Sequence, residues 1–594
     1  MFKNLNPKWD LDSYFPGGSD SPELAAYLET LEKDIRALSA HVQSLPGDPA
    51  QVSFWTNLLD RIQDVSVRMR HAGSFIGCLA AQNDQDRKAI IIGGRSRQLG
   101  AALASVLTKL DEFILKVPDA DWSRLMEAPE LSPIAFNLNE RRQRAKDKLP
   151  AEQEMLINSL SVDGYHAWGN VYNTAVSKVR IPFERDGKSV VLSAGQASNL
   201  MADPDRSVRA DLFAKWEKAW TEVEDFCATA LNHLAGYRLS VYRARGWEDV
   251  LREPLEMNRM SRETLEVMWD TIDRNKERVV AYLQRKKKLL GVHKLSWHDV
   301  SAPVGGTGRK VSYDEAANFI VEQVAPFSPR MAELVTRAFK ERWVEAEDRP
   351  HKRPGAFCSS SPVMKQSRVF MTFSGTVNNV ATLAHELGHA YHQSVMNDLP
   401  PLAQQYAMNV AETASTFSEM VVADAALRSA KTTEEKVSLM EDKLARSVAL
   451  LMNIHCRFLF ETRFYEERKK GMVSADRLSQ LMLEAQKEAF CDTLDEYHPR
   501  FWASKLHFYN TGVPFYNFPY TFGYLFSAGV YALAMEEGAA FEEKYVALLR
   551  DTGRMLVEDL ASKHLGVDLK QPEFWQKAID VAIADLDEFL ELTK

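Results

Sequence analysis

Apolar side chains recur three or four positions apart over most of the chain, which is the period of an amphipathic α-helix. The first such stretch follows the helix-start sequence Ser21-Pro22-Glu23 and continues to Leu38. Similar stretches follow at residues 52–69, 89–117, 150–160, 208–245, 263–290, 313–339, 433–469 and 474–490. The sequence therefore predicts a mainly α fold that begins with a helical bundle.

A pair of short apolar runs breaks this helical pattern. Residues 179–183 and 189–192 flank Asp186-Gly187, a dipeptide typical of the tight turn of a β-hairpin. We take this hairpin region as the end of an N-terminal helical lobe, residues 1–195, which precedes a second domain, residues 196–594. Two irregular stretches rich in Pro, Gly or Ser are predicted as loops or short strands, at residues 296–308 and 348–362.

Another extended segment, residues 368–373, is stopped by Ser374-Gly375 and followed by a predicted helix at residues 378–395. One interpretation is a buried structural strand. The other is an edge strand to which a bound peptide adds as a further strand through backbone hydrogen bonds. The segment by itself does not distinguish the two.

Composition and charge narrow the class of protein. The chain has 594 residues, too many for one simple core, and its 45% hydrophobic and 26% charged residues are ordinary globular values. A net charge of -9 without a basic stripe gives no support for nucleic-acid binding. The first ten residues lack an apolar signal core, and no uncharged apolar run of about 18 residues is present. We therefore expect a soluble protein that is not secreted by the usual signal and does not bind membranes.

The five cysteines are an odd number and never form a C-x-x-C pair, so we expect reduced thiols. They are Cys78, Cys227, Cys358, Cys456 and Cys491. Cys358 precedes the candidate active site, and we interpret it as a packed thiol.

The candidate chemistry lies in His385-Glu386-Leu387-Gly388-His389, an H-E-x-x-H motif inside the predicted helix at residues 378–395. Histidines at i and i+4 share one helix face, so both imidazoles can reach one tetrahedral zinc ion. Glu386 lies one residue round the helix, where it can act as the general base toward a metal-bound water. The pentapeptide alone is only moderately specific, but its apolar surroundings favour a buried site.

A catalytic zinc ion needs a third protein ligand, and three patterns compete. A metzincin pattern is excluded, because no glycine follows His389 at the required spacing. His392 lies seven residues from His385, too far along the helix axis to close a tetrahedron comfortably. Glu412, which lies among small and apolar residues of the next predicted helix, is the best candidate. Glu419 either orients a ligating imidazole or is a solvated carboxylate.

On these residues the chain resembles oligoendopeptidase F, within the thimet oligopeptidase group of zinc metallopeptidases. The resemblance lies in residues 382–390 (TLAHELGHA) and 411–417 (AETASTF), which look like the two metal-binding helices of that family. The opening Trp9-Asp10-Leu11-Asp12 and the segment from His507 to Tyr524 also look like family features. The likeness therefore covers nearly the whole chain.

The resemblance implies a two-lobed helical ellipsoid with a deep central channel, a zincin-type active-site helix and a small β region beside it. It also implies one zinc ion held by His385, His389 and Glu412, and cytoplasmic turnover of short unstructured peptides. An oxyanion site is expected from His507 with Tyr516 and Tyr520. The spacing departs from that of thimet-type members, so Tyr509 and Tyr524 stay as alternatives. With a peptidase implied, the edge-strand interpretation of residues 368–373 is favoured.

The expected function is therefore a zinc-dependent oligoendopeptidase with Glu386 as general base and His507, Tyr516 and Tyr520 as the other catalytic residues. One alternative is a dipeptidyl carboxypeptidase or another exopeptidase of the same group. The other is a helical protein that binds peptides without cutting them. The sequence does not determine the oligomeric state.

Overall fold

The computed structural model describes residues 2–43, 48–185, 187–304 and 310–594, and the chain divides into two compact units. Unit 1 comprises residues 1–148, 308–428 and 530–567, and unit 2 comprises residues 149–307, 429–529 and 568–594. Each unit is thus assembled from three separate segments. The sequence led us to expect a single division of the chain at residue 195. That residue lies within α8 (Ala194–Leu200), which belongs to unit 2.

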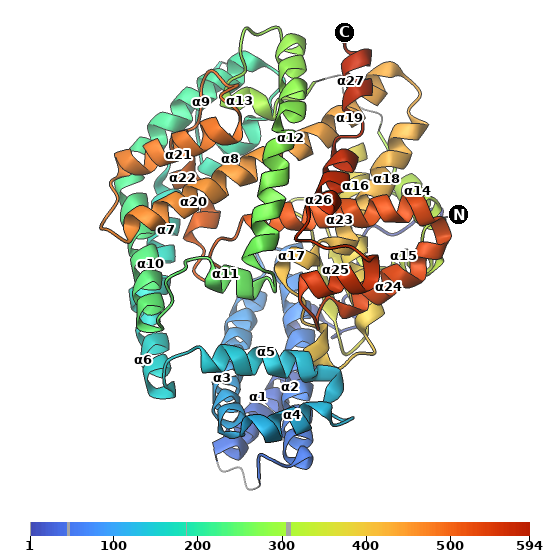
Figure 1. The fold of residues 1–594 in the computed structure, drawn as a ribbon. Coiled ribbons are helices and arrows are strands. Elements are labelled where there is room, and N and C mark those ends of the chain that lie inside the picture. The colour runs from blue at the N-terminus through green and yellow to red at the C-terminus, as the bar shows by residue number, and fades with distance from the viewer. Residues whose placement is uncertain (1, 44–47, 186, 305–309) are drawn as a thin grey trace. The chain divides into compact units, whose positions relative to one another are not determined.

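Unit 1 begins with the helical bundle that the periodicity predicts. Its long helices are α1 (Pro22–Gln43), α2 (Val52–Gln82) and α3 (Arg87–Lys116), which pack against one another and appear in blue in Figure 1. The shorter α4 (Asp119–Glu127) and α5 (Ala135–Lys146) follow. Leu24, Leu28, Leu31, Ile35 and Leu38 of α1 are all buried in the core. The amphipathic stripe is therefore confirmed residue by residue.

The later segments of unit 1 supply a small sheet and the helices around it. The helices are α14 (Tyr313–Val324), α15 (Pro329–Lys340), α16 (Val377–Met396), α17 (Met408–Ala411), α18 (Thr413–Ser429), α24 (Phe541–Asp551) and α25 (Val557–Leu565). The sheet has the strand order β3 (Val344–Glu345), β5 (Gln366–Phe370), β4 (Phe357–Ser361). Both α2 and α16 pack against β4 and β5.

The edge-strand interpretation of residues 368–373 is wrong for Val369 and Phe370. β5 is the central strand, parallel to β3 on one side and antiparallel to β4 on the other, with Phe370 opposite Phe357. Backbone N–H groups beyond the strand continue the pairing, since Met371 donates to Glu345 and Phe373 to Ala346. Val369 and Phe370 therefore belong to a buried structural strand, because a segment paired on both sides has no backbone edge to offer a peptide. Residues 371–373 lie past the end of the β4 pairing and are paired on the β3 side. Among the described strands of this sheet, the edges belong to β3 and β4.

The described residues of unit 2 form mainly helices, together with one β-hairpin. Its helices are α6 (Ala151–Ser161), α7 (Ala167–Lys178), α8, α9 (Arg206–Thr221), α10 (Glu224–Ala244), α11 (Arg252–Met257), α12 (Arg262–Leu289), α13 (Trp297–Val300), α19 (Thr433–Val448), α20 (Ile454–Arg468), α21 (Ala475–Ala489), α22 (Phe501–Ser504), α26 (Pro572–Ala582) and α27 (Leu586–Leu592). α23 (Phe518–Glu537) carries the boundary between the units.

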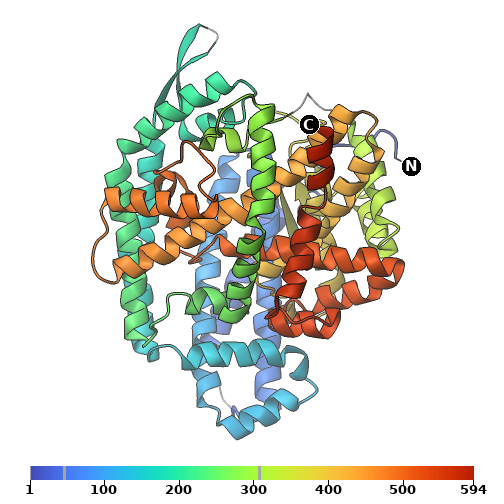
Figure 2. The same cartoon turned by 45° about the horizontal axis from the view of Figure 1, so that its top comes forward.

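The predicted hairpin is present as β1 (Ile181–Arg185) and β2 (Lys188–Leu192), antiparallel with Arg185 opposite Lys188. It projects beyond the helices of unit 2 at the top of Figure 2. Gly187 has φ of 72°, the left-handed conformation that a two-residue hairpin turn requires, while Asp186 lies outside the described residues. β1 packs on α9, which places the hairpin in unit 2 and not in the N-terminal bundle.

The mainly α fold class with a small β region beside the H-E-x-x-H helix is confirmed. The irregular stretches predicted at residues 296–308 and 348–362 contain α13 and β4, and residues 305–308 of the first lie outside the described residues. Among the helices that the structure describes, none combines the length and the apolar character needed to cross a membrane.

Candidate metal and catalytic site

The H-E-x-x-H helix, α16, has a defined start. Thr376 caps it: its hydroxyl accepts a hydrogen bond from the Asn379 N–H at 3.1 Å, and the Asn379 side chain accepts one from the Thr376 N–H at 3.4 Å. Val380, Leu383 and Leu387 are buried, so the helix is fixed on its apolar face. This anchorage determines the direction in which the polar face points.

On that polar face, two histidines meet a carboxylate. His385 Nε2 lies 3.1 Å and His389 Nε2 lies 3.5 Å from Oε2 of Glu412. One ligand atom from each of the three residues falls within 4.8 Å of the others. Two imidazole nitrogens and one carboxylate oxygen are the donor set of a catalytic zinc site with an open fourth position. The residues present therefore fit a divalent transition metal.

Glu412 does not lie inside a helix, as the sequence had led us to expect, but at the junction of α17 and α18. Its backbone, at φ -84° and ψ 1°, ends α17, and its carbonyl accepts a hydrogen bond from the Thr416 N–H at 3.0 Å. The Ser415 hydroxyl donates to Oε2 of Glu412 at 2.6 Å. The carboxylate is thus oriented from its own chain segment, although it stands beside both histidines.

Gly388 allows α16 to approach α18 closely enough for these contacts. A Cβ at position 388 would lie 2.5 Å from the Ala414 carbonyl oxygen and 2.5 Å from Cα of Ser415. Both are backbone atoms that follow Glu412 by two or three residues and cannot rotate away. The sequence reasoning did not single out Gly388 or Ser415; the small residues in both helix sequences were the available signal.

Glu419 is buried and holds His385 from the side away from Glu412. Its Oε2 lies 3.0 Å from Nδ1 of His385. The solvated-carboxylate alternative is therefore excluded, since this carboxylate fixes the orientation and tautomer of an imidazole in the way that carboxylates behind metal-ligating histidines do.

Burial and neighbouring charges shift the pKa values of this group in opposite directions. Burial opposes the charged form of His385, but the hydrogen bonds with Glu412 and Glu419 prevail and raise its pKa to about 10. Burial lowers the pKa of His389 to about 4 despite the nearby Glu412. Burial also opposes the charge of Glu412, yet His385 and His389 hold its pKa at about 2. With these pKa values Glu412 carries a negative charge beside a positively charged His385 and a neutral His389.

The carboxylate of Glu386 differs from its neighbours, because no hydrogen-bond partner for it exists in the described part of the chain. The residue is 6% exposed. Burial, helped by the negative charges of Glu412 and Glu419, raises its pKa to about 7. A carboxyl group with this pKa can both take up and release a proton near neutrality.

His392 does not join the three-residue group. It is fully buried, its Nε2 lies 2.9 Å from the Thr552 hydroxyl, and its ring stacks on Tyr406 with centroids 4.3 Å apart. Its role is packing, and a direct contact with substrate is excluded by burial.

The expected oxyanion residues belong to unit 2, where they form an aromatic cluster. The ring centroid of His507 lies 5.1 Å from that of Tyr516 and 6.0 Å from that of Tyr520. The two alternatives lie elsewhere in unit 2: Tyr509 is buried and stacks on Tyr172, and Tyr524 is buried with its hydroxyl 3.1 Å from that of Ser447. Of the tyrosines considered, Tyr516 and Tyr520 are the ones that flank His507.

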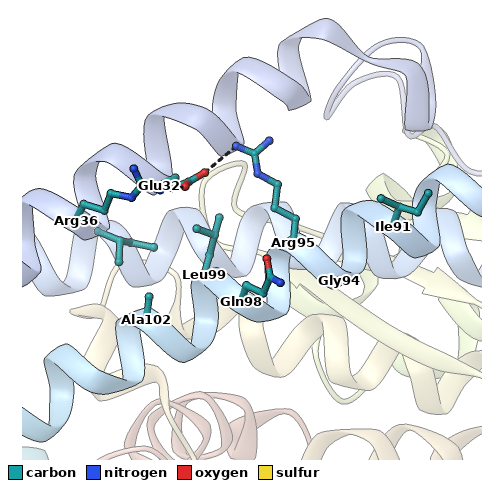
Figure 3. Close-up of a pocket in the computed structure, with 9 residues that line it drawn as sticks. Glu32, Arg36, Ile91, Gly94, Arg95, Gln98, Leu99 and Ala102 are labelled. Carbon is teal, nitrogen blue, oxygen red and sulfur yellow. Dashed lines mark hydrogen bonds and ion pairs between the residues drawn. The ribbon is translucent and has the colours of Figure 1, made fainter.

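A pocket on the N-terminal bundle contains no comparable chemistry. It lies between α1 and α3 and is lined by Glu32, Arg36, Arg95 and mostly small or apolar side chains (Figure 3). Arg95 and Arg36 both pair with Glu32, which neutralises the carboxylate at the surface. A single exposed ion-pair cluster provides neither a nucleophile nor a set of metal ligands.

Comparison with known proteins assigns the chain to a family. The sequence profile described as Peptidase family M3 matches residues 199–581. This chain belongs to peptidase family M3. A second profile, described as Oligopeptidase F, matches residues 114–180 and identifies the oligoendopeptidase F group within it.

Individual relatives in family M3 have low sequence identity to this chain but align with most of its length. Oligopeptidase PepF of Bacillus subtilis is 23% identical over 86% of this chain and 77% of its own length. Group B oligopeptidase PepB of Streptococcus agalactiae is 22% identical over 87% of this chain and 86% of its own length.

Solved structures share the fold. A protein of Chlamydophila abortus aligns with a TM-score of 0.84 at 19% identity, covering 99% of both chains. Oligoendopeptidase-F of Enterococcus faecium aligns with a TM-score of 0.70 at 17% identity, covering 96% of this chain and 99% of its own. The M3 assignment makes this protein a metallo-endopeptidase that acts on short peptides.

Proposed function

We propose that this M3 peptidase is a zinc-dependent oligoendopeptidase whose metal ligands are His385, His389 and Glu412, with Glu386 as general base. The supporting observation is the convergence of three ligand atoms within 4.8 Å beside Glu386, a buried carboxyl group for which the described residues provide no hydrogen-bond partner. A zinc ion bound there would act as a Lewis acid toward the scissile carbonyl and lower the pKa of a water molecule.

Glu386 takes the proton of the attacking water and passes it to the amine that leaves. Burial raises the pKa of this carboxyl group above its ordinary value, which makes it a stronger base than an exposed glutamate. Glu419 and Ser415 do not touch the reacting atoms; they hold His385 and Glu412 in place.

The His507–Tyr516–Tyr520 cluster contributes to stabilising the transition state. A phenol is a hydrogen-bond donor of the kind that stabilises the negative oxygen of a tetrahedral intermediate. This part of the proposal depends on the family resemblance. Replacing Tyr516 or Tyr520 by Phe removes a single hydroxyl group in each case. Comparing the cleavage rates of the two variants therefore distinguishes the contributions of the two phenols.

The test is cleavage of a mixed library of short peptides, including peptides blocked at both ends, with and without a chelator. We expect internal cuts in the blocked peptides, one zinc ion per chain and loss of cleavage on chelation. Products formed only from peptides with free C termini would instead indicate the exopeptidase alternative. Unchanged cleavage after chelation would refute the proposal that the reaction depends on a metal ion.

The ligand assignment has its own test. Glu412→Gln keeps the size of the side chain and removes its charge, so we expect zinc content per chain to fall well below one. The control is His392→Gln, whose side chain lies outside the group and should retain zinc. Zinc loss in the second variant but not in the first would reverse the assignment. The cytoplasmic setting is likewise a proposal, and cell fractionation tests it.

A further inference from the structure

A buried polar chain lies behind His507 in unit 2 and fixes the state of its ring. Nδ1 of His507 lies 2.8 Å from Oδ1 of Asn517, which is fully buried. The same Oδ1 accepts a hydrogen bond from Nη1 of Arg457 at 3.0 Å. Nδ2 of Asn517 donates to Glu461 at 3.4 Å. Neither the catalytic proposal nor the sequence motif accounts for this arrangement.

Arg457 decides which way the Asn517 amide points. A guanidinium has donors only, so the atom facing it must be the amide oxygen. Arg457 is itself held by Asn453, whose Oδ1 accepts from Nε at 2.9 Å and from Nη2 at 2.5 Å. The amide of Asn517 therefore cannot be reversed without bringing two donors together.

The amide oxygen in turn decides the tautomer of His507. A bare Nδ1 would place its lone pair 2.8 Å from an oxygen lone pair, which is repulsive, whereas an Nδ1–H donates to that oxygen. Arg457 Nη1 also lies 3.5 Å from Nδ1, but this longer contact is outweighed by the shorter one. His507 thus carries its proton on Nδ1 when neutral, and its Nε2 is an acceptor.

Burial keeps the ring neutral. It lowers the pKa of His507 to about 4, and the positive charges of Lys505 and Arg457 act in the same direction, against the hydrogen bond to Asn517. No atom in the described part of the chain hydrogen-bonds to Nε2. The ring of Tyr516 is nearly perpendicular to that of His507, and the ring of Tyr520 is nearly parallel to it.

We propose that His507 works as a hydrogen-bond acceptor, held in the Nδ1–H tautomer by the positioning residue Asn517, and that its Nε2 binds an N–H group of the peptide substrate. This deepens the proposed function and rests on it. The role expected from the sequence, donation of an imidazole N–H to the oxyanion, then passes to a phenol of the cluster.

The first test is direct and needs no activity. The zinc-loaded protein is labelled with ¹⁵N-histidine, and the His507 signals are those missing from the His507→Gln variant. We expect shifts of a protonated Nδ1 and an unprotonated Nε2 at pH 7.5. A protonated Nε2 would overturn the proposal, whether or not the protein cleaves peptides. Absence of cleavage by the wild type would refute the proposed function and leave this tautomer result standing.

The second test is Asn517→Asp, for which acceptor and donor roles predict opposite pH effects. The new carboxylate keeps the acceptor at Nδ1 and raises the pKa of His507, because it favours the imidazolium. Glu461, whose pKa burial raises to about 8, stays protonated and can donate to it. The charged groups facing His507 are Arg457 and Lys505. Burial lowers the pKa of Lys505 to about 8, which is above the pH range of the measurement, pH 5.5 to pH 7.5.

The measured quantity is kcat/KM of Asn517→Asp divided by kcat/KM of the wild type, determined from pH 7.5 to pH 5.5. Taking this ratio removes the effect of every group that titrates in the same way in both proteins. An imidazole at its ordinary pKa of about 6.5 is about nine-tenths protonated at pH 5.5, so the ratio should fall about tenfold. A ratio that stays flat or rises on acidification would overturn the acceptor role. Asn453→Asp is the matched control: it places the same charge on the far side of Arg457, and its ratio should stay flat.

Discussion

The chemistry assigned to Glu386 is best tested at the scale of that single side chain. Glu386→Gln keeps the shape and removes the base, so we expect kcat/KM for peptide cleavage to fall by on the order of 10² to 10⁴, the range that general acid–base catalysis contributes. Zinc content should stay at one per chain, because Glu386 contributes no ligand atom to the three-residue group. Metal analysis and cleavage rates on the same preparation check both.

A carboxylate elsewhere in unit 1 serves as the control for this change. Glu32, which pairs with Arg36 and Arg95 in the pocket of Figure 3, can be replaced by Gln without touching the metal group. An equal loss of activity in Glu32→Gln and Glu386→Gln would contradict the assignment of Glu386 as the general base. Near-normal activity in Glu386→Gln would contradict it as well.

At the scale of single residues, the sequence predicted those site residues whose arrangement depends only on their spacing along one helix. His385, Glu386 and His389 are related by one turn of helix, so their shared face follows from the motif. Asn517 had no such signal, because its partner Arg457 is 60 positions away and their contact exists only after α20 and the segment before α23 have packed.

The close approach of α16 to α18 is a property of the two elements, and Gly388 is its test. Gly388→Ala would place a methyl group 2.5 Å from backbone atoms of residues 414 and 415, so the helices must separate. We expect a loss of about 1–3 kcal/mol in the free energy of unfolding, the usual cost of overpacking, together with weaker zinc binding. Urea unfolding and zinc titration measure the two effects.

Gly77 provides the matched control, because it lies in α2 of the same unit and a Cβ there would meet nothing within 4 Å. Gly77→Ala should raise stability by about 0.5–1 kcal/mol through helix propensity alone. If Gly388→Ala behaved in the same way as Gly77→Ala, the close approach would not control the metal group.

Helices and strands differed in how far sequence periodicity could describe them. The stripe from Leu24 to Leu38 predicts α1 because helix formation and burial both follow the same local repeat. Residues 368–370, by contrast, looked the same whether their strand lay at an edge or in the centre. The strand became central because β3 pairs with it from residues 344–345 and β4 from residues 357–361, partners that no local pattern specifies.

At the scale of the whole molecule, each unit contains a buried carboxylate surrounded by cations. In unit 1, Asp551 accepts hydrogen bonds from Arg554, Lys563 and His564 at 2.7 to 2.8 Å. In unit 2, Asp299 is fully buried and pairs with Arg206 and Arg209 at 3.0 Å. Burial opposes ionisation of both, yet the surrounding donors hold both pKa values below the ordinary 3.8.

These lowered pKa values fix the sign of the pH dependence of folding. A carboxyl group with a lower pKa in the folded state binds fewer protons there than in the unfolded chain. Its stabilising effect is therefore complete above the unfolded pKa of 3.8 and is lost as the pH falls through the folded value. We therefore expect Asp299 and Asp551 to add a steep fall of the urea midpoint below pH 4 to the pH dependence that the buried histidines and glutamates with shifted pKa values produce at higher pH.

Replacing one of these carboxylates separates its effect from general acid denaturation. Asp551→Asn should lower the urea midpoint at pH 7, because the change removes the negative charge and one of the two acceptor oxygens that face Arg554, Lys563 and His564. It should also make the fall below pH 4 shallower than in the wild type. Asp559→Asn, which changes an exposed carboxylate in the first turn of α25, should have a much smaller effect on both the midpoint and its pH dependence. An acid-induced fall as steep in Asp551→Asn as in the wild type would show that proton uptake elsewhere limits the stability of the molecule.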